Sequence, residues 1–516
     1  MRLAFFPLIA AGLIAAGARA DVALGPLFAD HAVLQRDKPV PIWGRAVPGE
    51  TVTVSFLGRR VAARAGADGR WIALLDALPA TAEGSDLVAA GQTTATAHDV
   101  VVGEVWLASG QSNMEYVVDD PDGPVFHVDQ AAAEVAAARY PLIRQFKVAR
   151  QVAAEPADTA AGGWVPCSPA SVPEFSAVGY FFARDLHRRL GVPIGIVNST
   201  WGGTPVESWL SPMALASDPA FAVVGQRWSE TLAAYPRAQA AAEAALAAWR
   251  PEAEAARRGG PLAYALFLKA HPEPRPAHGP GDAWTPAGLF DGMINPLLPY
   301  ALRGAIWYQG ESNAARPGEY HALFAAMITA WRAHFGQGDF PFYWAQLADY
   351  NVPGDPTGAS WAWLREAQTQ TLSLPNTGQA VTIDIGDLGN IHPSNKQEVG
   401  RRLALLAKAR TYGIPDDCSG PVFVSATPEG RALRLHFKYA DEGLTAGLTP
   451  LQSFEVAGAD RRFYPARATI AGNTVLVAAP AVPAPVAVRY AWHNAPTANF
   501  YNGAGLPAVP FRSDRW

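Results

Sequence analysis

The stretch "GEVWLASGQSNMEY", from Gly103 to Tyr116, places a polar serine directly after a hydrophobic run. The run is rich in Val, Trp and Leu, which is typical of a buried strand. Ser112 follows it between two amide side chains, Gln111 and Asn113. Two interpretations stay open at this point: a turn, or a nucleophile held at the end of a sheet.

The region around this stretch, residues 102–415, alternates β-prone runs with helical ones. The predicted strands are "GEVWLAS", "PIGIVNS", "RGAIWYQ", "PFYWAQL" and "AVTIDIG". The predicted helices include "AVGYFFARDLHRRL", "EYHALFAAMITAWRAHF", "WLREAQTQTLSL" and "NKQEVGRRLALLAKARTYG". Such alternation predicts an α/β domain with a mostly parallel sheet and helices on both faces, that is, three α/β/α layers.

Two regions with a different pattern of predicted elements flank this domain. Residues 21–101 and 416–516 contain short β-prone runs separated by turn signals, such as "PVPIWGRAVPGETVTVSF" and "TVLVAA". This pattern predicts an N-terminal and a C-terminal β-sandwich-like domain. A chain of 516 residues is also long enough for several domains.

Composition narrows the class of protein. The chain is 49% hydrophobic and 17% charged, which is typical of an ordered globular protein. Its net charge is −5 and it has no basic block, which argues against nucleic-acid binding. The two cysteines, Cys167 and Cys418, lie in no metal-ligand motif, and the sequence leaves open whether they pair.

Residues 1–20 have the features of a secretory signal. An early Arg precedes a short apolar run, and Ala18-Arg19-Ala20 forms an A-x-A cleavage site before Asp21. The alternative is an N-terminal membrane anchor, for which the run is short. We therefore expect an exported protein, periplasmic or extracellular, without membrane insertion after signal removal. The oligomeric state cannot be read from the sequence.

An Ala-rich insertion interrupts the α/β region between the second and third predicted strands. It covers about residues 213–284, and its helical part runs from Glu230 to Gly260. Alanine favours helix but adds little core volume. We expect a surface helical hairpin, either a lid or a simple insertion.

Polar, amide-rich segments follow four of the predicted strands: "GQSNM", "STWGGTPVESW", "YQGESNA" and "DIGDLGNIHPSNK". Ligands bind outside the carboxyl ends of strands in such sheets, so these segments are expected to face one cleft. Their residues suit acyl transfer, with Ser112 as nucleophile and His392 as base. The glycine pair 202–203 and the amides of Gln309 or Asn313 offer N–H donors for an oxyanion. Taken alone, each residue is more often a turn or structural residue, and only the joint pattern is specific.

These four segments together resemble the sialate O-acetylesterase family, which belongs to the SGNH-type carbohydrate esterases. Two further segments extend the resemblance over nearly the whole mature chain except the insertion: "LFADHAVLQRDKPVPIWGRAVPGETVTV" and "NFYNGAGLPAVPFRSD". The resemblance implies an SGNH-hydrolase-like domain and hydrolysis of O-acetyl esters on sugars. It implies no metal and no organic cofactor.

The resemblance also implies residue roles. Ser112 is the nucleophile, His392 is the base, and the oxyanion hole consists of Ser112, Gly203 and Gln309, with Asn313 as the alternative to Gln309. SGNH enzymes usually carry an Asp three residues before the His, where this chain has a glycine. The third catalytic residue is predicted to be Asp387. Asn390, Asp384 and a Ser–His dyad remain alternatives.

Five polar residues near the motifs are expected to contact the substrate: Gln111, Asn113, Glu311, Asn313 and Arg365. Arg365 is one candidate partner for an anionic sugar, and its alternative is a helix-surface arginine. Acetylated xylan or xyloglucan fragments are rival substrates to sialates. Two other classes also remain open: a non-catalytic carbohydrate-binding protein, and a lipase or peptidase with the same chemistry.

Overall fold

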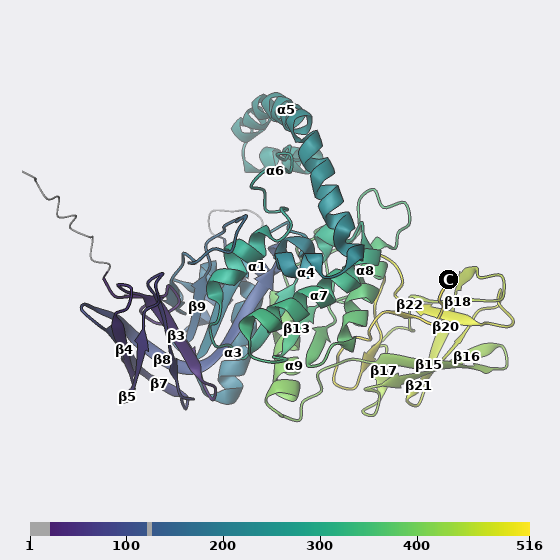
Figure 1. The fold of residues 1–516 in the computed structure, drawn as a ribbon. Coiled ribbons are helices and arrows are strands. Elements are labelled where there is room, and N and C mark those ends of the chain that lie inside the picture. The colour runs from purple at the N-terminus through teal and green to yellow at the C-terminus, as the bar shows by residue number, and fades with distance from the viewer. Residues whose placement is uncertain (1–20, 121–125) are drawn as a thin grey trace, which may run out of the picture.

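The computed structural model describes residues 21–120 and 126–516. Figure 1 shows a central unit of helices and strands between an N-terminal and a C-terminal β-unit, with a helical arm projecting from the centre. The predicted α/β class with additional β-domains is confirmed at this level. The predicted signal segment lies outside the described residues.

The central sheet has the strand order β10-β9-β11-β8-β12-β13-β14. The strands are β8 (Thr94–Gly110), β9 (Ile143–Lys147), β10 (Trp164–Pro166), β11 (Ile194–Thr200), β12 (Gly304–Tyr308), β13 (Phe342–Ala345) and β14 (Thr377–Ala380). Neighbouring strands along this order are parallel, except that β10 is antiparallel to β9. The sheet is therefore mixed, and the predicted, mostly parallel strands form its larger part.

Aromatic side chains attach helices to both faces of this sheet. On one face Trp106 of β8 contacts Phe182 of α3, with ring centroids 5.0 Å apart. On the opposite face Trp307 of β12 contacts Phe324 and Trp331 of α7, at 6.1 and 5.8 Å. The helices are α1 (Ser112–Glu115), α2 (Ala131–Ala137), α3 (Ala177–Leu190), α4 (Pro212–Ala216), α5 (Ala222–Arg258), α6 (Pro261–Ala270), α7 (Pro317–Phe335), α8 (Ser360–Gln370) and α9 (Lys396–Leu406).

The last strand of the sheet lies earlier than the sequence predicted. The segment "AVTIDIG" was expected to be this strand, but β14 ends at Ala380, where that segment begins. Val381 and Ile383 instead belong to the hydrophobic core of the C-terminal unit. The prediction was wrong because an apolar run does not tell which core will bury it.

Strand β8 belongs to two units at once. Its first half pairs with β7 and β2 of the N-terminal unit, and its second half pairs with β11 and β12. The domain boundary predicted between residues 101 and 102 therefore falls inside one continuous strand. The strands of the N-terminal unit are β1 (Ala23–Leu24), β2 (Val33–Gln35), β3 (Val40–Arg45), β4 (Thr51–Phe56), β5 (Arg59–Arg64), β6 (Arg70–Leu75) and β7 (Thr81–Ala90).

A buried carboxylate reinforces this junction. Glu104 of β8 is fully buried and bonds to Arg36 at 2.5 Å and to Arg303 at 2.7 Å. These partners lie in the N-terminal unit and just before β12, so one ion-pair cluster links both units. Buried charges need such pairing, because an unpaired charge in the interior is costly.

The C-terminal unit contains two four-stranded sheets and a two-stranded one. Its core includes Phe454, Tyr490 and Phe500, whose rings contact one another. The strands are β15 (Val422–Glu429), β16 (Ala432–Lys438), β17 (Leu444–Thr445), β18 (Phe454–Ala457), β19 (Phe463–Pro465), β20 (Arg467–Ala471), β21 (Thr474–Ala478), β22 (Ala487–Tyr490), β23 (Tyr501–Asn502) and β24 (Phe511–Arg512).

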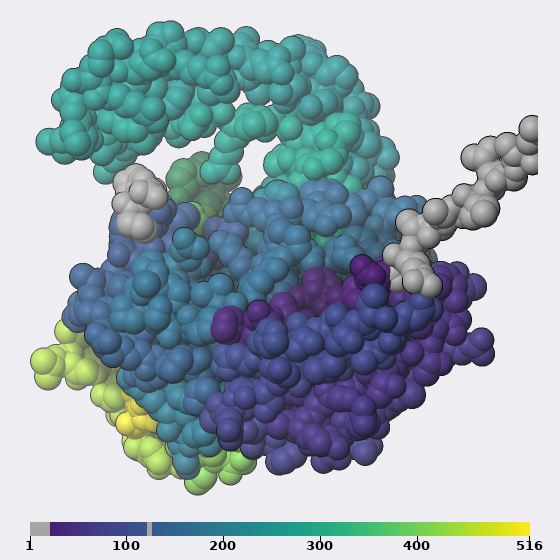
Figure 2. Space-filling model, turned by 90° about the vertical axis from the view of Figure 1, so that its left-hand side faces the viewer, coloured from purple at the N-terminus to yellow at the C-terminus, as the bar shows by residue number. Residues whose placement is uncertain are grey.

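Helices α5 and α6 form the Ala-rich arm. Helix α5 has 37 residues and includes two prolines, Pro236 and Pro251. Helix α6 folds back on it, with Trp249 and Phe267 in ring contact at 5.8 Å and Trp249 Nε1 donating to His271 O at 2.8 Å. Figure 2 shows the arm arching above the rest of the molecule, with open space beneath it.

Both cysteines are free thiols, and burial raises the pKa of Cys167 to about 11. Among the helices of residues 21–120 and 126–516, none combines the length and apolar character required to cross a membrane.

Candidate active site

Three of the polar motifs begin at the same level of the sheet. Gly110, at the end of β8, is in register with Thr200 of β11 on one side and with Tyr308 of β12 on the other. The segments that follow these residues therefore leave the sheet side by side. The fourth motif, in the loop before α9, closes over them: His392 Nε2 lies 2.8 Å from Ser112 Oγ.

A glycine is required where β8 ends. Gly110 has φ +133°, a conformation that side chains rarely adopt. A Cβ there would lie 2.2 Å from Tyr308 O, so the neighbouring strand leaves no room for one. The chain turns at this point and places Ser112 at the first position of α1.

The loop after β11 lies against Ser112. A Cβ added at Gly202 would be 3.3 Å from the Cβ of Ser112. The Gly202 N–H donates to Glu115 Oε2 at 2.8 Å, and Arg150 donates to the other oxygen of Glu115. In the described part of the chain, the backbone N–H groups of Ser112 and Gly203 donate to no other residue. Both remain available to an oxyanion.

The amides predicted to help in the oxyanion hole have other partners. Gln309 Nε2 donates to Thr204 O at 3.1 Å and to Asn313 Oδ1 at 2.7 Å, which occupies both of its hydrogens. Asn313 Nδ2 donates to Glu207 Oε2 at 2.7 Å. Gln309 and Asn313 are buried. In this arrangement they fix the loop after β11 to the end of β12, which corrects the predicted donor role of Gln309.

Asn113 links a buried lysine to a glutamate beneath the serine. Its Oδ1 accepts a hydrogen bond from Lys396 Nζ at 2.6 Å, and its Nδ2 donates to Glu311 Oε1 at 2.5 Å. Lys396 also donates to Pro393 O at 2.7 Å and lies over the Tyr116 ring. Burial raises the pKa of Glu311 and lowers the pKa of Lys396 to about 7. Asn113 and Glu311, predicted as substrate ligands, are part of this internal network.

The surroundings of His392 favour its neutral form. Burial, together with the positive charges of Lys396 and Arg275, lowers the pKa of His392 to about 4. Phe126 contacts the imidazole edge to face at 5.4 Å. A neutral imidazole is the form that can accept a proton from a serine.

None of the three candidate third residues contacts the imidazole. The exposed Asp387 accepts the Gly389 N–H at 2.8 Å, and Asn390 Oδ1 accepts the backbone N–H of His392 at 3.0 Å. Asp384 forms a two-point ion pair with Arg402. Across residues 21–120 and 126–516, Nδ1 of His392 has no hydrogen-bond partner. The structure therefore does not place Asp387 as the partner of the base.

Two other predicted substrate ligands are structural. Arg365 is fully buried and donates to four backbone oxygens, at distances of 2.8–2.9 Å. Two of these belong to the loop after β13, and two belong to the C-terminal unit. Gln111 is buried, and its Oε1 accepts the Ser312 N–H at 3.3 Å. Arg365 therefore joins domains and cannot reach a sugar carboxylate, contrary to both sequence interpretations.

The loop that follows the arm borders the site. Trp284 Nε1 donates to Gly203 O at 2.7 Å, and His278 stacks on Trp284 at 4.2 Å. Arg275 of the same loop is close enough to act on the charge of His392. The insertion is therefore in contact with the candidate oxyanion loop.

Sequence reasoning missed Lys396, Glu115 and Trp284. The first two lie inside quoted motifs, four residues after His392 and three after Ser112. No signal set these two apart, because the same motifs carry other charged residues, Glu104 in one and Asp384 and Asp387 in the other. Trp284 stands in a Pro/Gly-rich loop, which carries no signal either. In the described ranges, no group of three or more His, Cys, Asp or Glu side chains is placed to hold a metal ion.

Comparison with known proteins agrees with this arrangement. Residues 283–408 match the family described as "Carbohydrate esterase, sialic acid-specific acetylesterase". The chain is 30% identical to the rat protein "Sialate O-acetylesterase" over 93% of this chain and 92% of that protein. The human protein of the same name is 28% identical over 93% and 90% of the two chains.

A solved structure is also similar over nearly the full length. It is described as a novel carbohydrate acetylesterase from Xanthomonas citri and is 40% identical in sequence, with a TM-score of 0.79. The similarity covers 96% of this chain and 100% of that one. From the site and these relatives together, the chain belongs to the sialate O-acetylesterase family of carbohydrate esterases and is a carboxylic ester hydrolase.

Proposed function

We propose that this chain is a carbohydrate O-acetylesterase that works through a serine acyl-enzyme. The observation that carries the proposal is the 2.8 Å contact between Ser112 Oγ and His392 Nε2 at the convergence of the motifs. Ser112 attacks the acetyl carbonyl, and neutral His392 takes the serine proton. The N–H groups of Ser112 and Gly203 stabilise the oxyanion.

The collapse of the tetrahedral intermediate then releases the sugar. His392 passes the proton to the sugar oxygen as the C–O bond breaks, leaving an acetyl group on Ser112. A water molecule, deprotonated by His392, attacks this ester and frees acetate. The base returns to its starting form, so no cofactor is consumed.

Two arginines bear on the choice between a sialate and a neutral, acetylated hemicellulose fragment as substrate. A sialate carries a carboxylate, and exposed Arg275 places a positive charge close to His392. An acetylated xylan or xyloglucan fragment is neutral and needs no such charge. The burial of Arg365 favours this second class, because it removes the other arginine considered for a carboxylate.

The test compares acetate release from O-acetylated sialic acid and from acetylated xylo-oligosaccharides, in the wild type and in Arg275→Gln. If sialate is the substrate, kcat/KM for sialate exceeds that for the xylo-oligosaccharide, and Arg275→Gln lowers only the sialate value. The reverse preference, unaffected by the substitution, supports the hemicellulose alternative. No acetate from either sugar, with aryl acetate still hydrolysed, contradicts the carbohydrate function.

Substitution of Asp387 is expected to have little effect. Its carboxylate accepts the Gly389 N–H and not an imidazole hydrogen. We expect Asp387→Asn to keep kcat/KM for an aryl acetate within about threefold of wild type, whereas loss of a true triad aspartate costs about 10⁴ in serine proteases. Asp384→Asn, which weakens the ion pair with Arg402, serves as the comparison. A 100-fold loss confined to Asp387→Asn would restore it as the third member.

The pH profile offers a test of the base. Because the folded pKa of His392 is about 4, we expect kcat/KM to rise with pH through this value and to level off above it. Arg275→Gln removes a nearby positive charge, raises the pKa of His392 and moves the acidic limb to higher pH. Arg258→Gln, also in the insertion, is the matched control. It is expected to leave the acidic limb of the pH profile unchanged.

The salt dependence of the pH profile independently tests the effect of the Arg275 charge on His392. Arg275 is exposed, so 1 M salt is expected to move the wild-type limb upward and to have less effect on Arg275→Gln. A wild-type limb near the ordinary histidine value of about 6.5 would contradict the buried environment described for His392.

Export is proposed as well, to the periplasm or the medium, and rests on residues 1–20. N-terminal sequencing of the protein from an expressing bacterial culture tests this, with a mature start near Asp21 as the expected result. An uncleaved N-terminus in the cell interior would contradict it.

A further inference from the structure

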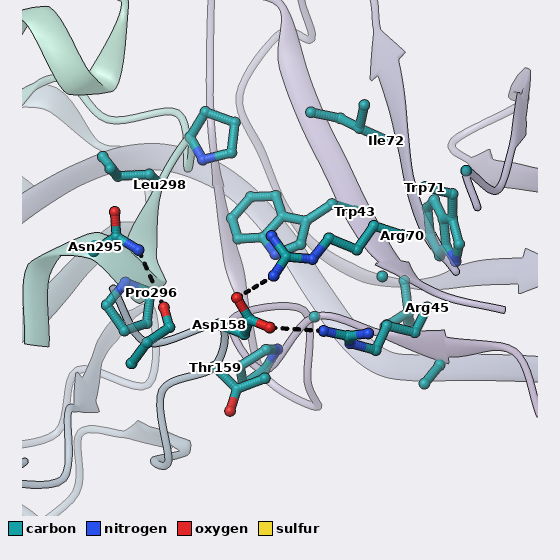
Figure 3. A pocket seen from close by; sticks show the side chains of 18 of the residues that line it. Trp43, Arg45, Arg70, Trp71, Ile72, Asp158, Thr159, Asn295, Pro296 and Leu298 are labelled. Atoms are coloured by element: carbon teal, nitrogen blue, oxygen red, sulfur yellow. Dashed lines mark hydrogen bonds and ion pairs between the residues drawn. The ribbon is translucent and has the colours of Figure 1, made fainter. Parts of the chain in front are cut away.

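A cavity with a volume of about 700 Å³ lies between the N-terminal unit and the central unit. One wall comes from strands β1, β3 and β6, and the other from residues 157–159, 295–296 and 298–299. Figure 3 shows Asp158 at its centre, joined to Arg45 and Arg70 on one side, with Asn295 and Leu298 opposite. None of the residues in the proposed catalytic chemistry lines it.

Three charged side chains form an ion-pair cluster in this cavity, with two arginines of neighbouring strands on one aspartate. Arg45 donates to Asp158 at 2.9 Å, and Arg70 donates to the other oxygen of Asp158. The three side chains are 49%, 54% and 47% exposed, in the order Arg45, Arg70, Asp158, so much of their hydrogen-bonding capacity faces water. Both donors therefore stand on the strand wall and face the acceptor on the opposite wall.

Two tryptophans, Trp43 and Trp71, also line the cavity. The indole of Trp43 is half-buried and held by edge contacts with Phe28 at 4.6 Å and Tyr300 at 6.0 Å. Trp71 is only 2% exposed, and its Nε1 donates to no described residue. The Nε1 atom likewise donates to no described residue in three other buried tryptophans, Trp307, Trp344 and Trp492. Nε1 of Trp71 is closed off from the cavity, so Trp71 contributes packing to the wall and not a hydrogen-bond donor.

We propose that this cavity binds a neutral saccharide unit of a glycan chain, separately from the ester-hydrolysing site. Sugar hydroxyls both donate and accept, so a vicinal pair matches the arginine donors beside the Asp158 acceptor. Trp43 offers an apolar surface to the C–H face. A carboxylated sugar offers an extra anion next to Asp158 and no donor for it, so it fits less well.

The test measures glycan binding with the cavity altered and the esterase site intact. The probes are two soluble neutral polymers, alkali-deacetylated xylan and deacetylated xyloglucan, in affinity gel electrophoresis of the full chain. We expect retardation of the wild type by at least one of the two polymers. The double variant Arg70→Ala/Asp158→Ala is expected to bind at least about tenfold more weakly, since it loses hydrogen bonds to charged groups.

The matched control is Arg59→Ala/Asp76→Ala, which removes another exposed Arg–Asp pair of the N-terminal unit, 3.7 Å apart and outside the cavity. It is expected to bind like wild type. Both double variants are expected to keep the wild-type Tm and the wild-type hydrolysis of an aryl acetate, which separates this proposal from the esterase function.

Three results would overturn the proposal. The first is the absence of retardation by either neutral polymer. The second is equal binding by the cavity variant and the wild type. The third is stronger retardation in polygalacturonate than in the neutral polymers, which would indicate an acidic ligand.

Discussion

Ser112→Ala is expected to lower kcat for an aryl acetate by about 10⁴- to 10⁶-fold, the range found when a serine nucleophile is removed from a hydrolase. The hydroxyl contacts His392 Nε2 at 2.8 Å and is replaced by a hydrogen, so no packing is lost. The measurement is single-turnover hydrolysis, together with mass spectrometry after treatment with a fluorophosphonate. The wild type gains one adduct and the variant gains none.

Ser312→Ala is the control for this experiment. Ser312 lies just past the end of neighbouring strand β12, and His392 Nε2 bonds to Ser112 and not to Ser312. It is expected to retain activity and labelling. A folded Ser112→Ala variant that keeps a tenth or more of the wild-type kcat rules out the acyl-enzyme at this residue.

Lys396→Met is expected to give the second-largest effect, on both stability and rate. The substitution keeps the length of the side chain but removes the donors to Asn113 Oδ1 and Pro393 O. It also removes the positive charge that compensates the buried Glu311. We expect the free energy of unfolding to fall by about 3 kcal/mol, as for other buried polar groups that lose a charged partner. Urea denaturation measures this loss.

The rate effect follows from what Lys396 holds in place. Pro393 follows the base directly, and Asn113 follows the nucleophile, so both are one residue from the reacting groups. We expect kcat to fall about 10²-fold with little change in KM, because misplacing reacting groups costs on this order. The acidic limb of the pH profile moves to higher pH, since a charge that lowers the pKa of His392 is gone.

Glu311→Gln in the Lys396→Met background tests the charge argument. It removes the uncompensated carboxylate and is expected to recover part of the stability but not the rate. If Lys396→Met loses stability while kcat and the pH limb stay as in wild type, Lys396 has only a structural role.

Local signals allowed much of the fold to be predicted. Helix α3 begins and ends where the sequence predicted, because Ser176 accepts the Gly179 N–H at one end and Gly191 adopts φ +67° at the other. Strands β8, β11 and β12 were recognisable as buried apolar runs. The mispredicted strand at residues 380–386 shows the limit, since its apolar residues serve the core of another unit.

The candidate site was predictable in position but not in detail. The motifs identified Ser112 and His392 because strand ends converge in such sheets. Gln309 and Arg365 have the right chemistry for an oxyanion and a sugar carboxylate, yet their hydrogen bonds go to the protein itself. Residue type does not reveal whether an amide or guanidinium is already occupied. The folded structure shows that Gln309 donates to Thr204 O and that Arg365 donates to backbone oxygens of the C-terminal unit.

Strand β8 has a consequence for how this protein can be cut and recombined. Removing residues 21–101 would truncate a continuous strand in its middle and leave Glu104 without Arg36. Strand β8 would keep β11 and β12 as neighbours, but residues 102 and 103 would lose their partners in β2, and Tyr300 would lose its ring contact with Phe28. The N-terminal unit is therefore not an independent module that a gene fusion could exchange. It and the catalytic unit share one backbone element, so we expect them to unfold in a single cooperative step and to be inherited together.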